Sequence, residues 1–350
     1  MNLNSKILID CDKLKKPNTG LHFFCLHLVN ALQEIALREN ETISIFAPSG
    51  THHYFGNDIY KLSRHLWNTC WMPLPSRYKI WHATHQQEKY FPTTKQSVIM
   101  TIHDLNFLYE GKRNPDKYLK TIQKNIDRSD KLVAISEYTK KDVLTHLNTG
   151  GKEITVIYNG GLRYEGPLTR PAWLNEERPF LFAIGTILRK KNFHVLPCLL
   201  KGNDYELIVS GNLSPYSEQI MAEAKRWGVE KRVRLSGPVD EAEKQWMLKN
   251  CHAFLFPSVA EGFGLPVVEA MQYGKPVFIS SRNSLPEIGG TVATYFNDTF
   301  DPEGMQEEFA KGIERYASGN ITPEMIKQNA KRFSWDDTAK NYWKIYQTML

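Results

Sequence analysis

Short apolar runs recur along the chain and alternate with stretches whose apolar residues fall at helical spacing. In the first half, such runs predict strands at residues 6–10, 42–47, 79–83, 97–103, 131–136 and 154–158. Residues 20–38 predict a helix between the first two strands, because Phe24, Leu28, Ala31, Leu32 and Ile35 fall on one face. Strands that alternate with helices indicate βαβ units and a parallel sheet.

The same alternation restarts after an aperiodic, glycine- and proline-containing segment near residues 160–178. Runs in the second half predict strands at residues 180–185, 206–211, 233–237, 253–257 and 276–280, and helices near 217–227, 241–248 and 335–349. A chain of 350 residues exceeds what one core usually supports. We therefore expect an α/β protein with two Rossmann-like domains, residues 1–165 and 175–334.

Positive charge is concentrated in the first half. Residues 1–165 contain 22 Lys and Arg against 16 Asp and Glu, whereas residues 166–350 contain 22 of each, so the first half holds the whole net charge of +6. A basic half fits a nucleic acid, an anionic membrane or a phosphorylated substrate. Nucleic acid is not expected, because no motif of the usual nucleic-acid-binding modules is present.

Part of this charge falls on one predicted helix. Basic residues recur there at helical spacing, at Lys117, Lys120, Lys124, Arg128 and Lys131, while Tyr118, Ile122 and Ile126 line another face. A basic amphipathic helix can lie on anionic lipid, although a solvated surface helix has the same pattern. Both interpretations remain open from the sequence.

The cysteines and the apolar runs indicate a cytoplasmic protein. The widely spaced thiols form no C-x-x-C pair, which indicates neither a disulfide framework nor a zinc site; they are Cys11, Cys25, Cys70, Cys198 and Cys251. The first ten residues run directly into a strand rather than into a signal peptide. No apolar run is evident that would cross a bilayer.

Residues 258–271 carry the most specific chemical signal. Glu261 and Glu269 stand eight positions apart, with Gly262, Gly264 and a proline between them, after a buried strand and at the start of a helix. Glycines let the backbone approach a ligand, and a helix N-terminus favours an anion such as phosphate. Glu269, one turn into the helix, can accept hydrogen bonds from two neighbouring hydroxyls, and Glu261 faces whatever carries the phosphate. This arrangement matches the needs of a sugar nucleotide.

The segment resembles the E-x7-E signature of retaining, nucleotide-sugar-dependent glycosyltransferases of the GT-B fold, in the large family four, and the resemblance extends over nearly the whole chain. It implies two Rossmann-like domains whose parallel sheets face each other across a cleft, with the last helix, residues 335–350, packed on the first domain. By the same resemblance, Gly262, Phe263, Gly264, Leu265 and Glu269 bind the nucleotide, and Glu261 acts on the transferred sugar.

Three other motifs resemble parts of the same family. Residues 185–192 resemble its glycine-then-basic loop, in which Lys190 and Lys191 match the basic pair and Arg189 stands beside them. Fixed cations there would stabilise the charge that develops on the departing diphosphate. His103 matches a strand-ending histidine that donates to a sugar hydroxyl and contributes partial positive charge, and Gly20 matches a turn that faces the phosphates or the acceptor.

The resemblance implies transfer of a sugar from a nucleoside diphosphate sugar to a hydroxyl of a cell-surface glycan or a lipid-linked oligosaccharide. GDP-mannose is the first choice, because residues 103–105 and 185–192 resemble those of bacterial mannosyltransferases, and a UDP-hexose or a deoxysugar nucleotide remains open. No metal or cofactor is expected, since no Asp-x-Asp motif is present. A non-catalytic sugar-nucleotide-binding subunit and a GT-B sugar-nucleotide epimerase remain open as alternatives. Peripheral contact with the anionic inner face of the cytoplasmic membrane is expected through the basic helix.

Overall fold

A computed structural model describes residues 5–17, 19–55, 60–63, 76–110, 114–162, 164–174 and 178–350. The chain divides into two compact units, one of Met1–Gly160 with Phe333–Leu350 and one of Gly161–Arg332. Cys70 and parts of the predicted linker lie outside the described residues. The other four cysteines are free and buried.

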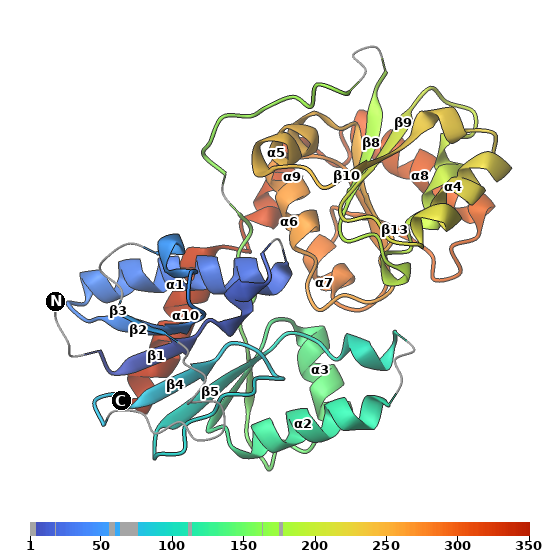
Figure 1. Ribbon diagram of the computed structural model, residues 1–350. Coiled ribbons are helices and arrows are strands. Elements are labelled where there is room, and N and C mark those ends of the chain that lie inside the picture. The colour runs from blue at the N-terminus through green and yellow to red at the C-terminus, as the bar shows by residue number, and fades with distance from the viewer. Residues whose placement is uncertain are drawn as a thin grey trace. The chain divides into compact units, whose positions relative to one another are not determined.

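Among the described residues, the first unit contains a seven-stranded sheet in the order β3-β2-β1-β4-β5-β6-β7 (Figure 1). Every neighbouring pair is parallel, as the alternation of strands and helices predicts. The elements of this unit are β1 (Ile7–Asp10), α1 (Gly20–Arg38), β2 (Ile43–Ala47), β3 (Tyr60–Ser63), β4 (Ile80–Ala83), β5 (Ser97–Ile102), α2 (Pro115–Asp127), β6 (Lys131–Ala134), α3 (Glu137–His146), β7 (Ile154–Val156) and α10 (Trp335–Met349).

Helices cover both faces of this sheet, so its strands are apolar throughout. Ile7 and Ile9 of β1 point into a core that they share with α1 and α10, and Leu8 points into a second core that contains Ile122 and Ile126 of α2. Helix α10, far away in sequence, thus packs beside α1 within the first unit (Figure 1).

A buried hydrogen-bond chain also joins α10 to the sheet. The Tyr346 hydroxyl lies 2.6 Å from His82 Nδ1, and His82 Nε2 lies 2.8 Å from Thr101 Oγ1. Thr101 Oγ1 in turn lies 2.8 Å from the Tyr342 hydroxyl. The four buried side chains of this chain are therefore all paired, which favours one position of α10 against the sheet.

The second unit contains, among its described residues, a six-stranded sheet in the order β10-β9-β8-β11-β12-β13, again parallel throughout. Its elements are β8 (Phe180–Ile184), β9 (Glu206–Ser210), α4 (Ser217–Arg226), β10 (Val233–Gly237), α5 (Glu241–Asn250), β11 (Ala253–Phe256), α6 (Leu265–Gln272), β12 (Val277–Ser280), α7 (Leu285–Gly289), β13 (Thr294–Phe296), α8 (Pro302–Ala317) and α9 (Pro323–Ala330). The α/β class with two parallel sheets is confirmed. The facing of the two sheets across a cleft stays a prediction.

Helix α1 is the one described helix whose length and apolar composition would suffice to span a membrane, contrary to the expectation from the sequence that no apolar run reaches that length. Its residues Phe24, Leu28 and Leu32 are buried in the core of the first unit, against α10. Core helices pass the same test of length and composition. We therefore interpret α1 as a core helix.

The predicted basic helix is shorter than its spacing indicates. Helix α2 ends at Asp127, with Arg128 as its C-cap residue, and Lys131 begins β6. The predicted extension to residue 131 is therefore wrong, because Asp130 accepts a hydrogen bond from the amide of Val98 and the chain there already pairs with β5. Ile122 and Ile126, which the sequence places on another face than the lysines, are buried.

Candidate active site

The loops that follow β8 and β11 meet at the centre of the second sheet. These two strands are parallel neighbours, and the strand order reverses on either side of β8. In open parallel sheets, ligands bind in the crevice outside the carboxyl ends of the strands at such a reversal. Residues 185–192 and 257–264 therefore occupy the position that a ligand site requires.

Two hydrogen bonds to one carbonyl fasten these loops together. The amide of Val259 donates to the carbonyl oxygen of Lys190 at 2.8 Å. The hydroxyl of Ser258 lies 3.0 Å from the same oxygen and 2.7 Å from Oε1 of Glu261. Because a hydroxyl has one hydrogen, Ser258 donates to one of these acceptors at a time. The carbonyl of Lys190 thus fixes the loop that carries Glu261.

Lys191 and Glu261 form an ion pair at this junction. Their side chains are only 13% and 14% exposed, so the pair is shielded from water. The ammonium group also lies 4.7 Å from the centre of the Phe256 ring. Gly185 leaves room for this lysine: its φ is +151°, and an added Cβ would lie 3.2 Å from Lys191 Cε. A cation and a carboxylate from distant parts of the sequence therefore share one site.

A glycine turn leads from Glu261 into α6. Gly264 has a φ of +112°, and a Cβ there would lie 2.8 Å from Leu285 Cδ2, so the position requires glycine. The Ser284 hydroxyl lies 3.1 Å from the Glu261 carbonyl and 3.0 Å from that of Phe263, which holds the buried turn in place. The first amides of a helix lack intrahelical acceptors and favour an anion. The turn at Gly262–Leu265 thus presents a phosphate-binding geometry beside Lys191.

Glu269 lies on α6 and pairs with Lys244 of α5. The Lys244 ammonium lies 3.1 Å from Oε1 of Glu269 and 2.9 Å from Oε1 of Glu241. Burial raises the pKa of Glu269 and the charge of Lys244 opposes that rise. Burial acts to lower the pKa of Lys244, but the charges of Glu269 and Glu241 outweigh it and the pKa is raised. The pair keeps a charged carboxylate in a buried place.

Sequence reasoning missed Lys244. It stands three residues after Glu241 on a helix, a spacing typical of a surface ion pair, and nothing in the chain connects it with Glu269. Only the packing of α5 against α6 brings these residues together.

The other two predicted cations differ from Lys191. Arg189 is exposed, and Lys190 is half-buried and uses its carbonyl to hold the neighbouring loop. Lys191 is thus the member of the run that lies against Glu261.

The remaining predicted residues lie in the first unit. His103 is buried, and its Nε2 donates to the carbonyl oxygen of Thr84 at 2.8 Å. Burial lowers the pKa of His103 to about 4, so the ring is neutral at pH 7 with Nδ1 free to accept. In this structure the N–H of the ring is engaged by Thr84, and the role of His103 at the transferred sugar stays a prediction. Gly20 is exposed at the start of α1 with open space around its Cβ position, so the backbone does not require glycine there.

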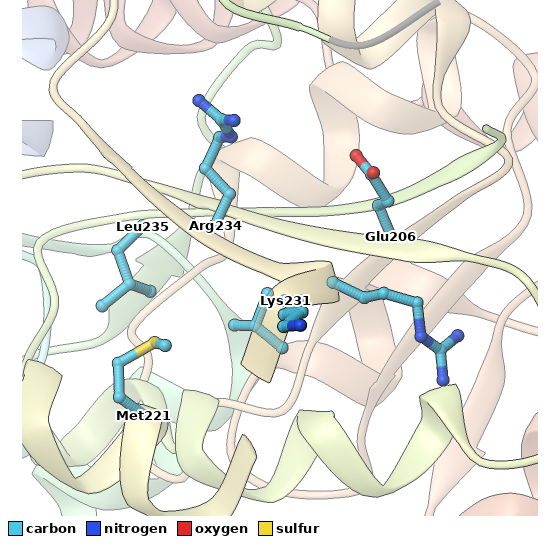
Figure 2. Close-up of a pocket in the computed structure, with 7 residues that line it drawn as sticks. Glu206, Met221, Lys231, Arg234 and Leu235 are labelled. Atoms are coloured by element: carbon cyan, nitrogen blue, oxygen red, sulfur yellow. The ribbon is translucent and has the colours of Figure 1, made fainter. Parts of the chain in front are cut away.

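A separate hollow of about 360 Å³ lies at β10, an edge strand of the second sheet (Figure 2). Glu206, Lys231 and Arg234 surround it, and it contains none of the predicted site residues. Within the described part of the chain, no group of three His, Cys, Asp or Glu side chains could hold a metal ion. The candidate site therefore consists of the loops that follow β8 and β11.

Comparison with known proteins agrees with this architecture. Residues 169–333 match the family model for glycosyl transferases group 1, and residues 43–160 match that for Glycosyltransferase Family 4. Together these matches cover most of both units.

Relatives and solved structures span nearly the whole chain. O-antigen chain mannosyltransferase B of Escherichia coli is 22% identical over 98% of this chain and 100% of its own length. O-antigen chain mannosyltransferase RfbU of Salmonella typhimurium is 22% identical over 88% of this chain and 91% of its own. The structure of Anabaena HepE in complex with UDP and glucose aligns with a TM-score of 0.72 and 16% identity, over 98% of this chain and 99% of that one. With the two family models and the parallel sheets of both units, these similarities show that the chain belongs to the glycosyltransferases of the GT-B fold, and that it is similar to mannosyltransferases.

Proposed function

We propose that this glycosyltransferase moves a mannosyl group from GDP-mannose to a hydroxyl of a glycan or lipid-linked acceptor, with retention at the anomeric carbon. The observation that carries the proposal is the Lys191–Glu261 pair, next to the glycine turn that opens α6. A cation, a row of helix N-terminal amides and two carboxylates match the diphosphate, the sugar and the ribose of a sugar nucleotide.

Donor binding then exchanges one ion pair for another. The diphosphate takes the place of Glu261 as the partner of Lys191, and the Gly262–Leu265 amides bind it as well. The freed carboxylate of Glu261 accepts hydrogen bonds from the sugar hydroxyls. Arg189 and Lys190 belong to the same loop as Lys191 and add positive potential there.

The chemical step places negative charge on the diphosphate. The bond between the anomeric carbon and the diphosphate oxygen breaks as the acceptor oxygen forms its bond on the same face of the sugar. The acceptor proton passes to the departing phosphate oxygen. Lys191 stabilises that departing charge, and for this reason we propose that transfer needs neither a bound divalent cation nor a cofactor.

Three residues have finer proposed roles. Glu269, kept ionised by Lys244, accepts hydrogen bonds from the ribose hydroxyls. His103 acts through Nδ1 as an acceptor from a sugar hydroxyl, since its Nε2 hydrogen is already engaged by Thr84. Gly20 is proposed to border the phosphate or acceptor path without a backbone requirement of its own.

The identity of the donor and the acceptor is supported by the relatives. Two of them are named for mannose transfer to O-antigen chains, which favours GDP-mannose and an acceptor of cell-surface polysaccharide synthesis. The complex of HepE with UDP and glucose keeps a UDP-hexose as the alternative donor. We further propose cytoplasmic residence with peripheral contact at the anionic inner face of the membrane, where a lipid-linked acceptor is located.

The proposal is tested by a thermal-shift screen of GDP, UDP, ADP and TDP sugars on the full chain. A ligand that binds only the native state raises the apparent stability, so GDP-mannose should give the largest shift. The protein is then incubated with GDP-mannose and an acceptor, and the product is analysed by NMR. The new glycosidic bond should keep the α-configuration of the donor. A preference for UDP-glucose would replace the donor assignment, and an inverted product would reject retention.

Glu269→Ala is expected to weaken binding of the nucleoside diphosphate. Loss of a charge-assisted hydrogen bond costs roughly 1.5–3 kcal/mol, which corresponds to about a 10- to 150-fold increase in Kd by calorimetry. Lys244 retains Glu241 as a partner, so the variant should fold. Unchanged affinity in a folded variant would remove the ribose assignment.

Lys244→Met is expected to make nucleotide binding more sensitive to acid. A buried carboxylate that loses its cation has a higher pKa, so Glu269 becomes protonated, and affinity is lost, at a higher pH than in the wild type. Glu241 and Tyr273, which also face Glu269, are unchanged in the variant. Calorimetric Kd values across a pH series provide the measurement, and Lys244→Arg is the charge-preserving control. Superimposable pH profiles would show that Lys244 does not act on Glu269.

A further inference from the structure

We propose that a groove on the first unit, between α2 and the segment after β4, is a binding site for phosphate groups of the acceptor. The inference rests on the proposed function, because the ligand is the acceptor of the proposed transfer. This acceptor carries a phosphate or a diphosphate. The groove has a volume of about 690 Å³. The residues that line it and enter the argument are Lys89, Lys117, Lys120, Lys124, Asn125 and Arg128.

Two elements supply the basic side chains. Lys117, Lys120 and Lys124 follow one another at three- and four-residue spacing on α2, so they share one helix face, and Lys89 comes from the segment after β4. The opposite face of α2, with Ile122 and Ile126, is buried in the core. The groove is thus a concave surface between two segments rather than a row of charges on a single helix.

Buried contacts hold these two segments together. Asn125 is only 4% exposed, and its Nδ2 donates to the carbonyl oxygens of Gln86 and Glu88, each at 3.0 Å. The guanidinium of Arg128 lies 4.5 Å from the centre of the Phe91 ring and donates to the carbonyl oxygen of Pro92 at 3.3 Å. The walls of the groove are therefore fixed before any ligand arrives, which lowers the entropic cost of binding.

The groove holds excess positive charge that the fold leaves uncompensated. Its two acidic lining residues are Glu88, which pairs with Lys13 at 2.6 Å, and Asp116 in the first turn of α2. Among the described residues, no carboxylate forms an ion pair with Lys117, Lys120 or Lys124. Like charges at these spacings repel each other, and a bound anion relieves that repulsion.

The chemistry of the lining favours phosphate. Lysine ammonium groups are point charges that bind phosphate oxygens without a fixed geometry. A groove of this size admits a phosphate together with the groups attached to it. The same chemistry is offered by the diphosphate of a soluble glycan and by that of a lipid-borne one, and separate experiments distinguish the two sources.

The test compares two full-length variants that remove the same charge. Lys117→Gln, Lys120→Gln and Lys124→Gln are combined in the groove variant. Lys79→Gln, Lys95→Gln and Lys141→Gln are combined in the control, because these exposed lysines of the first unit do not line the groove. All six positions are exposed, so both variants should fold.

Two binding probes separate the sources. Inorganic pyrophosphate is titrated by calorimetry with the nucleoside diphosphate present at saturation, so that the β8 and β11 loops are occupied. Binding to anionic vesicles is measured by co-sedimentation at low salt. The vesicles contain phosphatidylglycerol in phosphatidylcholine, and vesicles of pure phosphatidylcholine are the blank. The groove variant should lose roughly 100-fold in affinity for the probe that binds, while the control loses far less. Binding of pyrophosphate alone assigns a soluble phosphorylated acceptor, and binding to the anionic vesicles assigns a lipid-borne one.

The proposal is overturned if wild-type protein binds neither probe, or if the groove and control variants bind alike. Thermal shift by the nucleoside diphosphate is measured on the same samples. It reports the proposed donor function independently, because the groove variant leaves the second unit unchanged. If the nucleoside diphosphate gives no thermal shift in wild-type protein, the proposed donor function is contradicted. If the groove and control variants bind the probes equally, the groove proposal is contradicted instead.

Discussion

Lys191→Ala is expected to lower the turnover number about 10²- to 10³-fold, the effect seen when one fixed group that stabilises transition-state charge is removed. The reason is positional: the ammonium lies in a shielded site where charge develops on the diphosphate, so its interaction is stronger than it would be in water. Initial rates at saturating donor give kcat, and calorimetry with the nucleoside diphosphate gives the ground-state affinity.

The outcome for Lys191 is judged against two controls. Lys191→Arg keeps the charge but not the shape, and should recover part of the rate. Thermal unfolding measures the accompanying loss of stability, which is expected because Lys191→Ala leaves the shielded carboxylate of Glu261 without its cation. A turnover number near that of the wild type would transfer the role to Lys190 or Arg189.

Glu261→Ala is expected to reduce turnover about 10- to 100-fold or more while the affinity for the bare nucleoside diphosphate is kept or improved. Loss of hydrogen bonds to the sugar slows transfer. At the same time Lys191 loses its competing carboxylate and becomes fully available to the diphosphate. Rates and Kd values are measured separately, and Glu261→Gln preserves the shape of the side chain. A variant that loses nucleotide affinity and keeps its rate would contradict the assignment.

The ion pair predicts that these two substitutions are coupled. Residues in direct contact depart from additivity by about 0.5–3 kcal/mol. The double variant Lys191→Ala/Glu261→Ala should therefore be less impaired than the product of the single effects. Additive effects would show that the two side chains act separately, despite their contact in the structure.

Much of the fold could be predicted from the pattern of apolar residues. The helices that begin at Gly20, Ser217, Glu241 and Trp335 start where their sequences predict. Strand β3, strand β13 and helices α8 and α9 were not predicted. Strand β13 has three residues and two of them are only half-buried, which leaves little periodic signal. Helix α8 does carry a start signal, because Asp301 caps it and Pro302 follows.

The sequence by itself determined which residues can carry the chemistry. Glycine at position 264, carboxylates at 261 and 269 and cations at 189–191 are chemical requirements of a phosphate and sugar site, and they are visible as residue types at a fixed spacing. It also determined the parallel sheets, because strands buried on both faces must be apolar throughout.

Only the tertiary structure decided which groups are partners. The pairing of Lys191 with Glu261, that of Lys244 with Glu269, the engaged Nε2 of His103, and the joining of α2 to the segment after β4 all link positions distant in sequence. Charge state and hydrogen-bond capacity depend on burial and on neighbours in space. These quantities are fixed by the packing of whole elements, and so no local spacing of residues reveals them.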